Sequence, residues 1–424
     1  MTKSDTPAAP QRAPLKPLKP LEEALAELLA EAAPLPGVET VSTFDADGRV
    51  LAQDLLSGLD VPAHDNSAMD GYAVRCADWE NFTTVLQVKQ RIAAGSSGHA
   101  LAPASAARIF TGAPIPPGAD AVVMQEDCET VDAGAAESSG VRIRQQPKPG
   151  QWIRRSGEDV ASGTAVLHSG ERLTPAALGL AASIGFDKLP VAARVRVALF
   201  STGDELVMPG DVAPGDMKPG AIYNSNRFFL RALLLRLGCS VTDLGIVPDR
   251  LDATVAALQN ASQQHDLILT SGGVSVGEED HIKPAVQALG ELKLWQIAIK
   301  PGKPFAYGKI GPAHFIGLPG NPVSSFVTFL LLVRPFILKL QGATGIAPKS
   351  VALPAHFDWA RADKRREFLR VKHDGKGGLA LFDNQSSGVL TSAVWGDGLV
   401  DNPPGQAIAH GDLVQFIAFA EFLA

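Results

Sequence analysis

The chain has 424 residues, a formal net charge of −7, 46% apolar residues and 20% charged residues. This length exceeds what one ordinary hydrophobic core can serve, so we expect a soluble globular protein of two to four domains. The net negative charge argues against a protein that binds nucleic acid over its whole surface, although it leaves room for a local basic pocket that holds an anion.

Three cysteines, Cys76, Cys128 and Cys239, lie far apart and form no CxxC pair. They predict neither a disulfide framework nor a thiolate metal site, and a reducing cytoplasm suits them best. No apolar signal segment is visible at the start of the chain. The apolar stretch 326–340 is interrupted by Arg334-Pro335 and is too short to span a bilayer, so we expect a buried helix and no membrane partner.

The first part of the chain predicts a tail, a linker domain and an insertion. Residues 1–19 are rich in Pro, Ala and Lys and predict a disordered tail. Short β-type runs alternate with turn clusters over 65–158, which predicts a small β-rich second domain. Helix signals stand on either side of it, one at 20–33 and one that begins at Thr174-Pro175. We therefore expect a discontinuous N-terminal linker domain made of 20–64 and 159–193.

Residues 194–342 show the rhythm of an α/β domain. Strands are expected at 195–200, 240–247, 266–270, 292–299 and 314–316, and helices at 226–237, at 249–263 with Asp249 or Asp252 as its N-cap, and from Pro322 onwards. Strands that alternate with helices predict a doubly wound, parallel sheet. The pattern then changes again, and residues 343–424 predict a small C-terminal domain of β strands.

Four glycine-rich loops follow strands of this α/β domain, at 201–205, 270–281, 300–304 and 317–322. Ligands of open parallel sheets bind outside the carboxyl ends of the strands, so these loops should share one binding edge. Any one of them alone is more often a plain turn, because glycine and proline are the ordinary turn residues. The coincidence of four such loops favours a functional site.

The side chains of these loops suit an anionic substrate. Gly272 and Gly273 permit positive φ, so backbone amides can converge on an oxyanion, and Ser271 and Ser275 add hydroxyl donors. The segment Lys300–Pro304 supplies positive charge from Lys300 and Lys303, and Pro304 helps to stiffen it. Acids such as Glu205 and Asp280 are hard oxygen ligands that suit Mg²⁺. Together they indicate a phosphorylated or pyrophosphate substrate with a divalent cation.

A second polar cluster lies at the start of the β-rich region, in the stretch HDNSAMDGYA at 64–73. Asp65 and Asp70 could bind a cation or the edge of an amino-heterocycle, or they could belong to a network of Asx turns. Thr111 could likewise be a ligand hydroxyl or a cap at the end of a strand. The nine histidines show no metal-ligand spacing.

These segments together resemble the molybdopterin molybdenumtransferase (MoeA) family. The matching stretches are DNSAMDGYAVR (65–75), RIFTGAPIPPGADAVV (108–123), STGDEL (201–206), TSGGVSVGEED (270–280), KPGKPFAYG (300–308), GLPGNPVSS (317–325) and REFLRV (366–371). They occur in order over nearly the whole chain after residue 20, and several are long and unusual. The resemblance therefore covers the chain and not a single loop.

The resemblance implies a fold and an activity. The fold is multidomain α/β plus β: a central α/β domain similar to the MogA and MoaB proteins, an inserted β-rich domain, a mixed linker domain and a C-terminal domain similar to a β-barrel. The activity is insertion of molybdenum from molybdate into adenylylated molybdopterin, with Mg²⁺-dependent hydrolysis of the adenylate. A homodimer is also implied, in which the α/β domain of one chain faces the β-rich domain of the other.

The resemblance also implies roles for individual residues. The pterin and metal cleft would contain Glu205 and Asp280, with Asp249 nearby, and would be completed by Asp65 and Thr111. The oxyanion-binding segment of the family is matched by Lys300, Lys303 and Pro304. A molybdate pocket could be closed by Arg366, Arg370, Ser387 and Ser392. One departure is Trp395-Gly396, where a smaller, alanine-like pair is expected, and it bears on how the last domain approaches the lysines.

Two other functions are compatible with parts of this pattern. One is molybdopterin adenylyltransferase, the preceding step, although a single α/β domain would suffice for it. The other is a non-catalytic cofactor-binding scaffold, which the absence of a long linker or fused partner domain disfavours. Expected partners are adenylylated molybdopterin, molybdate, a second copy of the chain and, in the pathway, an adenylyltransferase and apo-molybdoenzymes.

Overall fold

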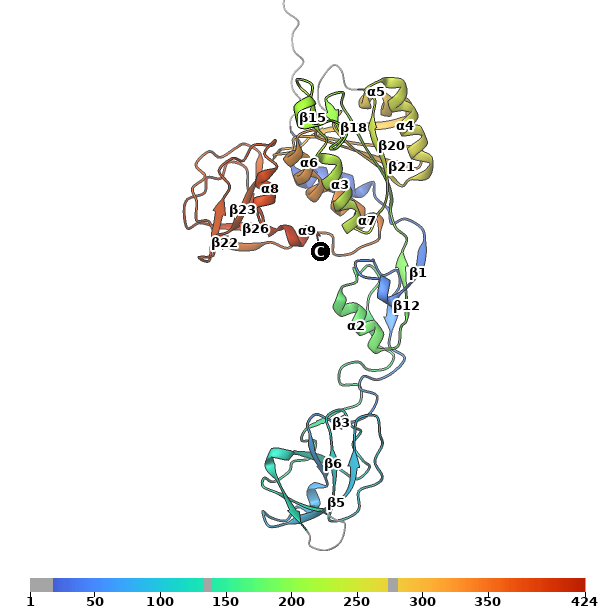
Figure 1. The fold of residues 1–424 in the computed structure, drawn as a ribbon, viewed down its shortest axis with the longest axis vertical. Coiled ribbons are helices and arrows are strands. Elements are labelled where there is room, and N and C mark those ends of the chain that lie inside the picture. Colours follow the sequence, from blue (N-terminus) through green and yellow to red (C-terminus); the bar gives the residue numbers. More distant parts are fainter. Residues whose placement is uncertain (1–17, 133–138, 274–280, 424) are drawn as a thin grey trace, which may run out of the picture.

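The computed structural model describes residues 18–132, 139–273 and 281–423. The molecule is elongated, with a β-rich domain at one end, an α/β domain and a C-terminal β domain at the other, and a narrow linker between them (Figure 1). The predicted class, multidomain α/β plus β, is confirmed. Most of the predicted tail lies outside the described residues, but the Lys19 amide donates to the Gln296 carbonyl at 2.8 Å.

The linker is built from segments on both sides of the β-rich domain. Strand β1 (Val38–Ser42) pairs antiparallel with β12 (Lys188–Ala192), and β2 (Leu55–Leu56) pairs with β11 (Ala165–Leu167). Helix α2 (Pro175–Ser183) begins after Thr174, whose hydroxyl accepts a hydrogen bond from the Ala177 amide at 3.2 Å, as its sequence signal predicts. Because the chain passes through the linker twice, the β-rich domain is held by two strand pairs.

Helix α1 (Leu21–Ala30) has a place that the sequence interpretation did not give it. Its buried residues Leu21, Ala24 and Leu28 belong to the large core of the α/β domain and not to the small core of the linker. The leucine spacing predicts the buried face of the helix but does not indicate which domain receives that face.

The β-rich domain contains a six-stranded sheet with strand order β7-β4-β6-β5-β9-β8. Its strands are β4 (Gly71–Val74), β5 (Val85–Ile92), β6 (Ser105–Ile109), β7 (Ala121–Met124), β8 (Cys128–Asp132) and β9 (Ser139–Ile143), and a short pair is formed by β3 (Asn66–Ser67) and β10 (Ile153–Arg154). Apolar residues on its two faces form two separate small cores. Short 3-10 turns occur here and elsewhere at η1 (Thr43–Asp45), η2 (Cys76–Asp78), η3 (Gln125–Asp127) and η4 (Pro214–Asp216).

The α/β domain is a six-stranded sheet with strand order β16-β13-β17-β21-β20-β18. The strands are β13 (Arg196–Thr202), β16 (Ser240–Val247), β17 (Leu267–Ser271), β18 (Gly290–Gln296), β20 (Pro304–Ile310) and β21 (Ala313–Leu318). The predicted parallel pairing holds for β16, β13, β17 and β21, but β20 is antiparallel to both of its neighbours, which the sequence did not indicate. Its link to β21 has only two residues, which permits a hairpin but not a parallel crossover.

Helices cover both faces of this sheet. On one face lie α1, α3 (Asn226–Arg236), α6 (Pro322–Thr328), the π-helical turn η5 (Phe329–Val333) and α7 (Arg334–Leu340), and on the other lie α4 (Leu251–Gln264) and α5 (Ile282–Leu289). The prediction that Asp249 or Asp252 caps α4 is wrong, because the helix begins at Leu251 after Arg250 and Asp252 falls in its first turn. The helical segment Pro322–Leu340 is long and apolar enough to cross a membrane by length and composition alone, but 83% of its apolar stretch is buried inside the protein, as in a core helix.

The C-terminal domain has the strand order β19-β23-β25-β26-β22, with β24 paired to β23. Its strands are β22 (Val351–Pro354), β23 (Arg366–His373), β24 (Leu379–Leu381), β25 (Gly398–Asn402) and β26 (Leu413–Ala418), with helices α8 (Thr391–Trp395) and α9 (Phe419–Leu423). The first strand, β19 (Ile299–Lys300), comes from the α/β domain, where the sequence predicts one strand over 292–299. Two short strands, β14 (Leu206–Val207) and β15 (Ile222–Tyr223), pair beside the end of β13.

Candidate active site

The strand register places all four glycine-rich loops at one edge of the α/β sheet. Strands β13, β16, β17 and β21 are parallel, so their carboxyl ends meet there. Strand β18 is antiparallel to β20 and therefore runs in the same direction as β21, with its last residue Gln296 opposite Pro304. The loop between β18 and β20 therefore lies at the same edge, although β20 itself runs antiparallel to the other strands.

The loops after β17 and β21 touch each other. The Gly272 amide donates to the Leu318 carbonyl at 3.0 Å, and a Cβ on Gly320 would lie 3.9 Å from the Gly272 Cα. Gly273 has φ +65°, and a Cβ there would come within 2.5 Å of the Ile282 side chain. Only glycine fits this turn without displacing the helix that follows it. Ser271, at the end of β17, is buried; Ser275 and Asp280, both predicted site residues, lie outside the described part of the chain.

The asparagines of the stretch Asn224-Ser225-Asn226 also belong to this edge, and sequence reasoning missed them. The Asn226 side-chain amide donates to the Gly320 carbonyl at 2.7 Å, which ties the start of α3 to the loop after β21. Asn224 is 2% exposed, and its side-chain nitrogen has no hydrogen-bond partner among the residues described. The signal that could have identified them is a pair of amide side chains around the start of α3, one just before the helix and one as its first residue.

The predicted acidic residues lie beside the same loops. Glu205 is exposed after β13, and its carboxylate folds back so closely that a Cβ on Gly203 would meet it at 2.6 Å. Together with Asp204, Asp216 and Lys218 it lines a cavity of about 480 Å³. Asp249 is half-buried two residues after β16. Over the ranges that the structure covers, no three His, Cys, Asp or Glu side chains are grouped as metal ligands.

The two predicted anion-binding lysines differ in their surroundings. The Lys300 ammonium lies 3.0 Å from a Glu367 carboxylate oxygen and 3.4 Å from an Asp363 carboxylate oxygen, both in the C-terminal domain. Lys303 is exposed and forms no ion pair with any described residue. Pro304 opens β20. Of the two positive charges, that of Lys303 is therefore the one that no described carboxylate balances.

The C-terminal domain brings a third cation, Arg370, close to this edge. The Val323 amide in the first turn of α6 donates to the Ser387 carbonyl at 2.9 Å, so the loop that carries Ser387 adjoins the α/β domain. Arg370 is 1% exposed and donates to the Ser392 hydroxyl at 3.1 Å and to the Phe368 and Ser386 carbonyls. Burial lowers its pKa to about 10, and no described carboxylate balances its charge.

Arg366, four residues earlier, is already paired. Its guanidinium donates to both Asp401 carboxylate oxygens at 2.5 Å and also to Glu22 of α1, and these contacts raise its pKa. Trp395, the departure noted in the sequence, packs against Phe382 with ring centroids 5.2 Å apart, and the Lys372 ammonium lies 4.4 Å from its ring. Arg366 therefore has one partner in its own domain and one in α1, and Trp395 has its partners within the C-terminal domain.

The polar cluster of the β-rich domain is hydrogen-bonded within itself. Asp65 accepts from the Ser156 amide at 2.9 Å and from the Arg155 guanidinium at 2.5 Å, and these contacts lower its pKa. Asp70 accepts from the amide and the hydroxyl of Thr111, each at 2.8 Å, and its pKa is lowered as well. The domain lies at the opposite end of the molecule from the α/β edge (Figure 1), so one chain does not bring Asp65 and Thr111 to Glu205 or Lys303.

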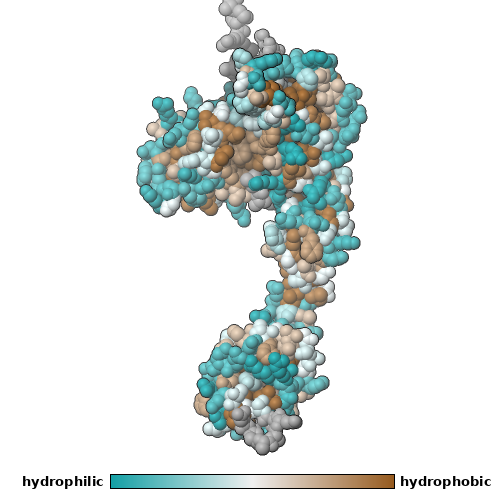
Figure 2. Space-filling model, in the orientation of Figure 1, coloured by the Kyte–Doolittle hydropathy of each residue, from teal (hydrophilic) through white to brown (hydrophobic). Residues whose placement is uncertain are grey.

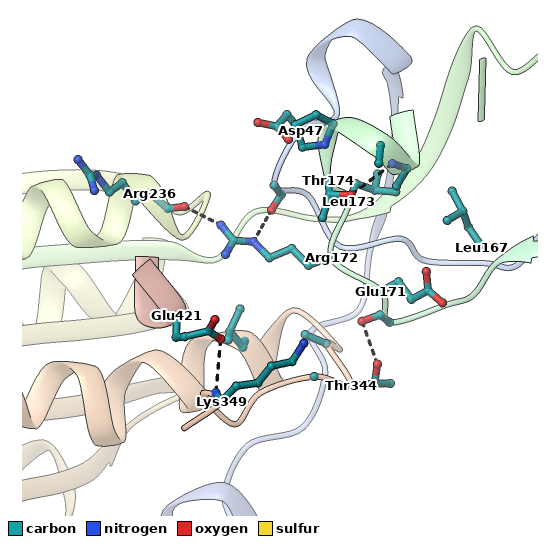
Figure 3. A pocket seen from close by; sticks show the side chains of 18 of the residues that line it. Asp47, Leu167, Glu171, Arg172, Leu173, Thr174, Arg236, Thr344, Lys349 and Glu421 are labelled. Atoms are coloured by element: carbon teal, nitrogen blue, oxygen red, sulfur yellow. Dashed lines mark hydrogen bonds between the residues drawn. The ribbon is translucent and has the colours of Figure 1, made fainter. Parts of the chain in front are cut away.

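A cavity of about 1010 Å³ separates the linker from the α/β and C-terminal domains. Figure 3 shows Arg172 crossing it: the guanidinium donates to the Gly48 carbonyl at 3.0 Å and to the Arg236 carbonyl at 2.8 Å. Thr344 donates its amide to the Gly170 carbonyl on the same side. These contacts join the linker to the rest of the molecule, and no described residue of the glycine-rich loops lines the cavity.

The fold and the loops at the carboxyl edge of the α/β sheet define a multidomain protein whose α/β domain binds the ligand. Residues 198–339 match a family model described as a probable molybdopterin binding domain. Residues 19–185 match the MoeA N-terminal region (domain I and II), and residues 352–419 match the MoeA C-terminal region (domain IV). The chain therefore belongs to the molybdopterin molybdenumtransferase (MoeA) family, as the sequence resemblance indicated.

Similar proteins support this assignment over nearly the full length. A molybdopterin molybdenumtransferase of Haemophilus influenzae is 44% identical over 367 residues, which cover 84% of this chain and 87% of that protein. Molybdopterin molybdenumtransferase 2 of Mycobacterium tuberculosis is 38% identical and covers 90% of this chain and 94% of its own. A crystal structure of a molybdopterin biosynthesis MoeA protein from Pyrococcus horikoshii matches with TM-score 0.82 and 28% identity, covering 95% of this chain and 100% of that one. The chain is thus a transferase of molybdenum cofactor biosynthesis.

Proposed function

We propose that this enzyme inserts molybdenum from molybdate into adenylylated molybdopterin, with hydrolysis of the adenylate and release of AMP and the finished cofactor. The observation that carries the proposal is the meeting of glycine loops, unbalanced cations and carboxylates at one edge of the α/β sheet. Adenylylated molybdopterin and molybdate are both anions, and the edge presents groups that suit both kinds.

Molybdate, a tetrahedral dianion, would bind between Lys303 and Arg370. Lys303 has no described counter-ion, and the Arg370 guanidinium is buried among neutral acceptors. An unbalanced buried charge is costly, and an oxyanion is the kind of partner that would offset that cost. Ser387 stands beside the first turn of α6 and would close the pocket from the C-terminal domain.

The pterin and its pyrophosphate would lie along the loops after β13 and β17. Positive φ at Gly272 and Gly273 allows backbone amides to face phosphate oxygens, with Ser271 and Ser275 as neighbouring hydroxyls. Glu205 and Asp280 would hold Mg²⁺, since carboxylate oxygens are its preferred protein ligands, and Asp249 would act nearby. When bound, Mg²⁺ would polarise the phosphoanhydride toward attack by water. Glu205 would also orient that water.

We further propose that the working form is a homodimer. Asp65 and Thr111 lie too far along the molecule to reach the edge loops of their own chain, but a second chain laid alongside would bring them there. Exposed apolar side chains on the linker and on α3 support such packing: Val38 is 56% exposed, Phe44 96%, Leu56 57% and Phe228 53%. Figure 2 shows apolar patches along the narrow linker. A reducing cytoplasm would suit the three free cysteines.

The test is to incubate purified protein with adenylylated molybdopterin, Mg²⁺ and molybdate. We expect AMP release that depends on molybdate, together with a product that reconstitutes an apo-molybdoenzyme. AMP release no greater than the rate without protein would contradict the proposal. Formation of the adenylate from molybdopterin and ATP would instead assign the preceding step, and tight pterin binding without turnover would indicate a scaffold.

A further inference from the structure

Lys300 and Glu367 form an ion pair across the boundary between two domains. Lys300 comes from the loop between β18 and β20, and Glu367 lies on β23 of the C-terminal domain. The Glu367 side chain is 1% exposed, whereas the Lys300 side chain is 37% exposed. The buried partner is therefore the carboxylate, and the lysine reaches in from the outside to meet it.

The Glu367 carboxylate is the centre of a small polar network. One oxygen accepts a hydrogen bond from the Lys300 ammonium at 3.0 Å. The other accepts from the Trp359 indole N–H at 2.8 Å and, more weakly, from the Asp363 amide at 3.4 Å. Lys300 is the one cation within ion-pair distance of Glu367 in the described structure. Without the lysine, the buried carboxylate would keep only neutral hydrogen-bond donors, with the Arg365 charge beyond ion-pair distance, which is strongly unfavourable.

The same place holds a backbone connection between the domains. Ile299 and Lys300 pair in parallel with Arg366 and Glu367, and the Arg366 amide donates to the Ala298 carbonyl at 2.9 Å. Lys303 follows three residues after Lys300, and Arg370 follows three residues after Glu367. The position of one proposed molybdate ligand relative to the other therefore depends on this short ladder and on the ion pair beside it.

We propose that Lys300 is a positioning residue rather than an anion ligand: its ammonium neutralises the buried Glu367 carboxylate and thereby fixes the Lys300–Pro304 loop against the C-terminal domain. The proposal deepens the proposed function, since the loop it fixes carries Lys303. It also separates two lysines that look equivalent in the sequence. Lys300 acts through Glu367, and Lys303 faces the anion.

The test is a double-mutant cycle with Lys300→Met, Glu367→Gln and the combination of both. The readouts are the Kd of the pterin-free protein for molybdate by calorimetry, the KM for molybdate, and amide exchange of the segments 296–304 and 363–370. Lys300→Met should raise Kd and KM at least about tenfold and speed exchange in both segments, because it leaves the buried carboxylate unbalanced. Lys309→Met is the control, since Lys309 pairs with Glu31 at 2.9 Å on the same domain. It should change neither the Kd and KM for molybdate nor the exchange of the two segments.

The decisive comparison is between the single and double variants. If Lys300 acts by neutralising Glu367, Glu367→Gln removes the need for it, and the double variant should differ from Glu367→Gln alone by less than about threefold in Kd. If Lys300 instead binds molybdate directly, Glu367→Gln should tighten binding by freeing the lysine, and Lys300→Met should weaken binding at least as strongly in the Glu367→Gln background as in the wild type. That second pattern would overturn the proposal. The exchange readout needs no turnover, so unchanged exchange in Lys300→Met would refute the positioning role even if the protein released no AMP.

Discussion

The two ends of this molecule hold their polar groups in opposite ways. At the edge of the α/β sheet, Lys303 and Glu205 are exposed without ion-pair partners in the described structure, and Arg370 is buried without a counter-ion. In the β-rich domain, Asp65 already accepts hydrogen bonds from Arg155 and Ser156, and Thr111 already donates one to Asp70. The α/β edge therefore has charged groups available to bind a ligand, whereas the polar groups of the β-rich domain are already hydrogen-bonded to one another.

This difference indicates which role each domain would have in a shared site. An exposed group without an ion-pair partner, such as Lys303, can bind a small anion from solution because no internal contact has to break first, whereas Arg370 would exchange some of its hydrogen bonds for the anion. Groups held by neighbours are preorganised and can shape or orient a substrate without great loss of entropy. We therefore expect substitutions at the α/β edge to abolish chemistry and substitutions in the β-rich domain to weaken substrate positioning.

The largest expected effect is that of Glu205→Gln. Loss of the carboxylate should lower single-turnover AMP release by about 100-fold or more, because both metal binding and the orientation of water would suffer. Asp216→Asn, which lines the same cavity without lying on a loop that follows a core strand, is the matched control and should stay within about threefold. Equal losses in the two variants would argue that the cavity needs negative charge in general and not Glu205 in particular.

A smaller effect is expected for Asp65→Asn. AMP release should fall by about tenfold through poorer positioning, while the calorimetric Kd for molybdate alone should stay unchanged, since the proposed ligands of that anion are Lys303 and Arg370 and not Asp65. Glu158→Gln is the control, because Glu158 accepts from the Arg155 amide in the same turn at 2.8 Å. A rise in the molybdate Kd of Asp65→Asn would place the two ends in one binding site for this anion.

The comparison extends to stability against acid. Burial, with Lys309 nearby, lowers the pKa of His314 in the α/β domain to about 4, and its ring nitrogen lies 2.9 Å from the Tyr307 hydroxyl. An unfolded histidine titrates near pH 6.5, so the stability that His314 provides is present above about pH 6.5 and is lost as the pH falls toward 4. The lowered pKa values of Asp65 and Asp70 act in the β-rich domain only below about pH 4.

Amide exchange resolved by peptide would measure these two pH windows separately. Between pH 6.5 and 4, protection should decline in the α/β domain and hold in the β-rich domain, and His314→Gln should flatten the decline. A parallel loss of protection in both domains over this window would contradict the assignment to His314.

Much of the α/β domain could be predicted because its strands and helices have strong local signals. The leucine-rich run of α3 and the buried triplet Leu267-Ile268-Leu269 of β17 lie where their patterns predict. Strand β20 was missed, since Pro304-Phe305-Ala306-Tyr307-Gly308 shows no alternation and follows a proline-rich turn. The division of 292–300 between β18 and β19 depends on pairing with β23, which is distant in sequence.

Local sequence signals also predict the candidate site only in part. Glycine loops after buried strands identify the edge, because parallel strands must bring their carboxyl ends together. The difference between Lys300 and Lys303 could not be predicted, since it depends on Glu367 in another domain. The asparagines at the start of α3 were visible in the sequence, but an Asn-Ser-Asn turn alone does not indicate contact with Gly320.

The most direct test of a site shared between two chains is complementation between two impaired variants. Glu205→Gln chains and Asp65→Asn/Thr111→Val chains are unfolded, mixed in equal amounts and refolded, and AMP release is measured per chain. If each site combines the α/β edge of one chain with the β-rich domain of the other, half of the dimers are mixed and each has one intact site, so about 25% of wild-type activity should return. If the site lies within one chain, every chain keeps a defect, and the mixture should show only the average of the two variants' residual activities.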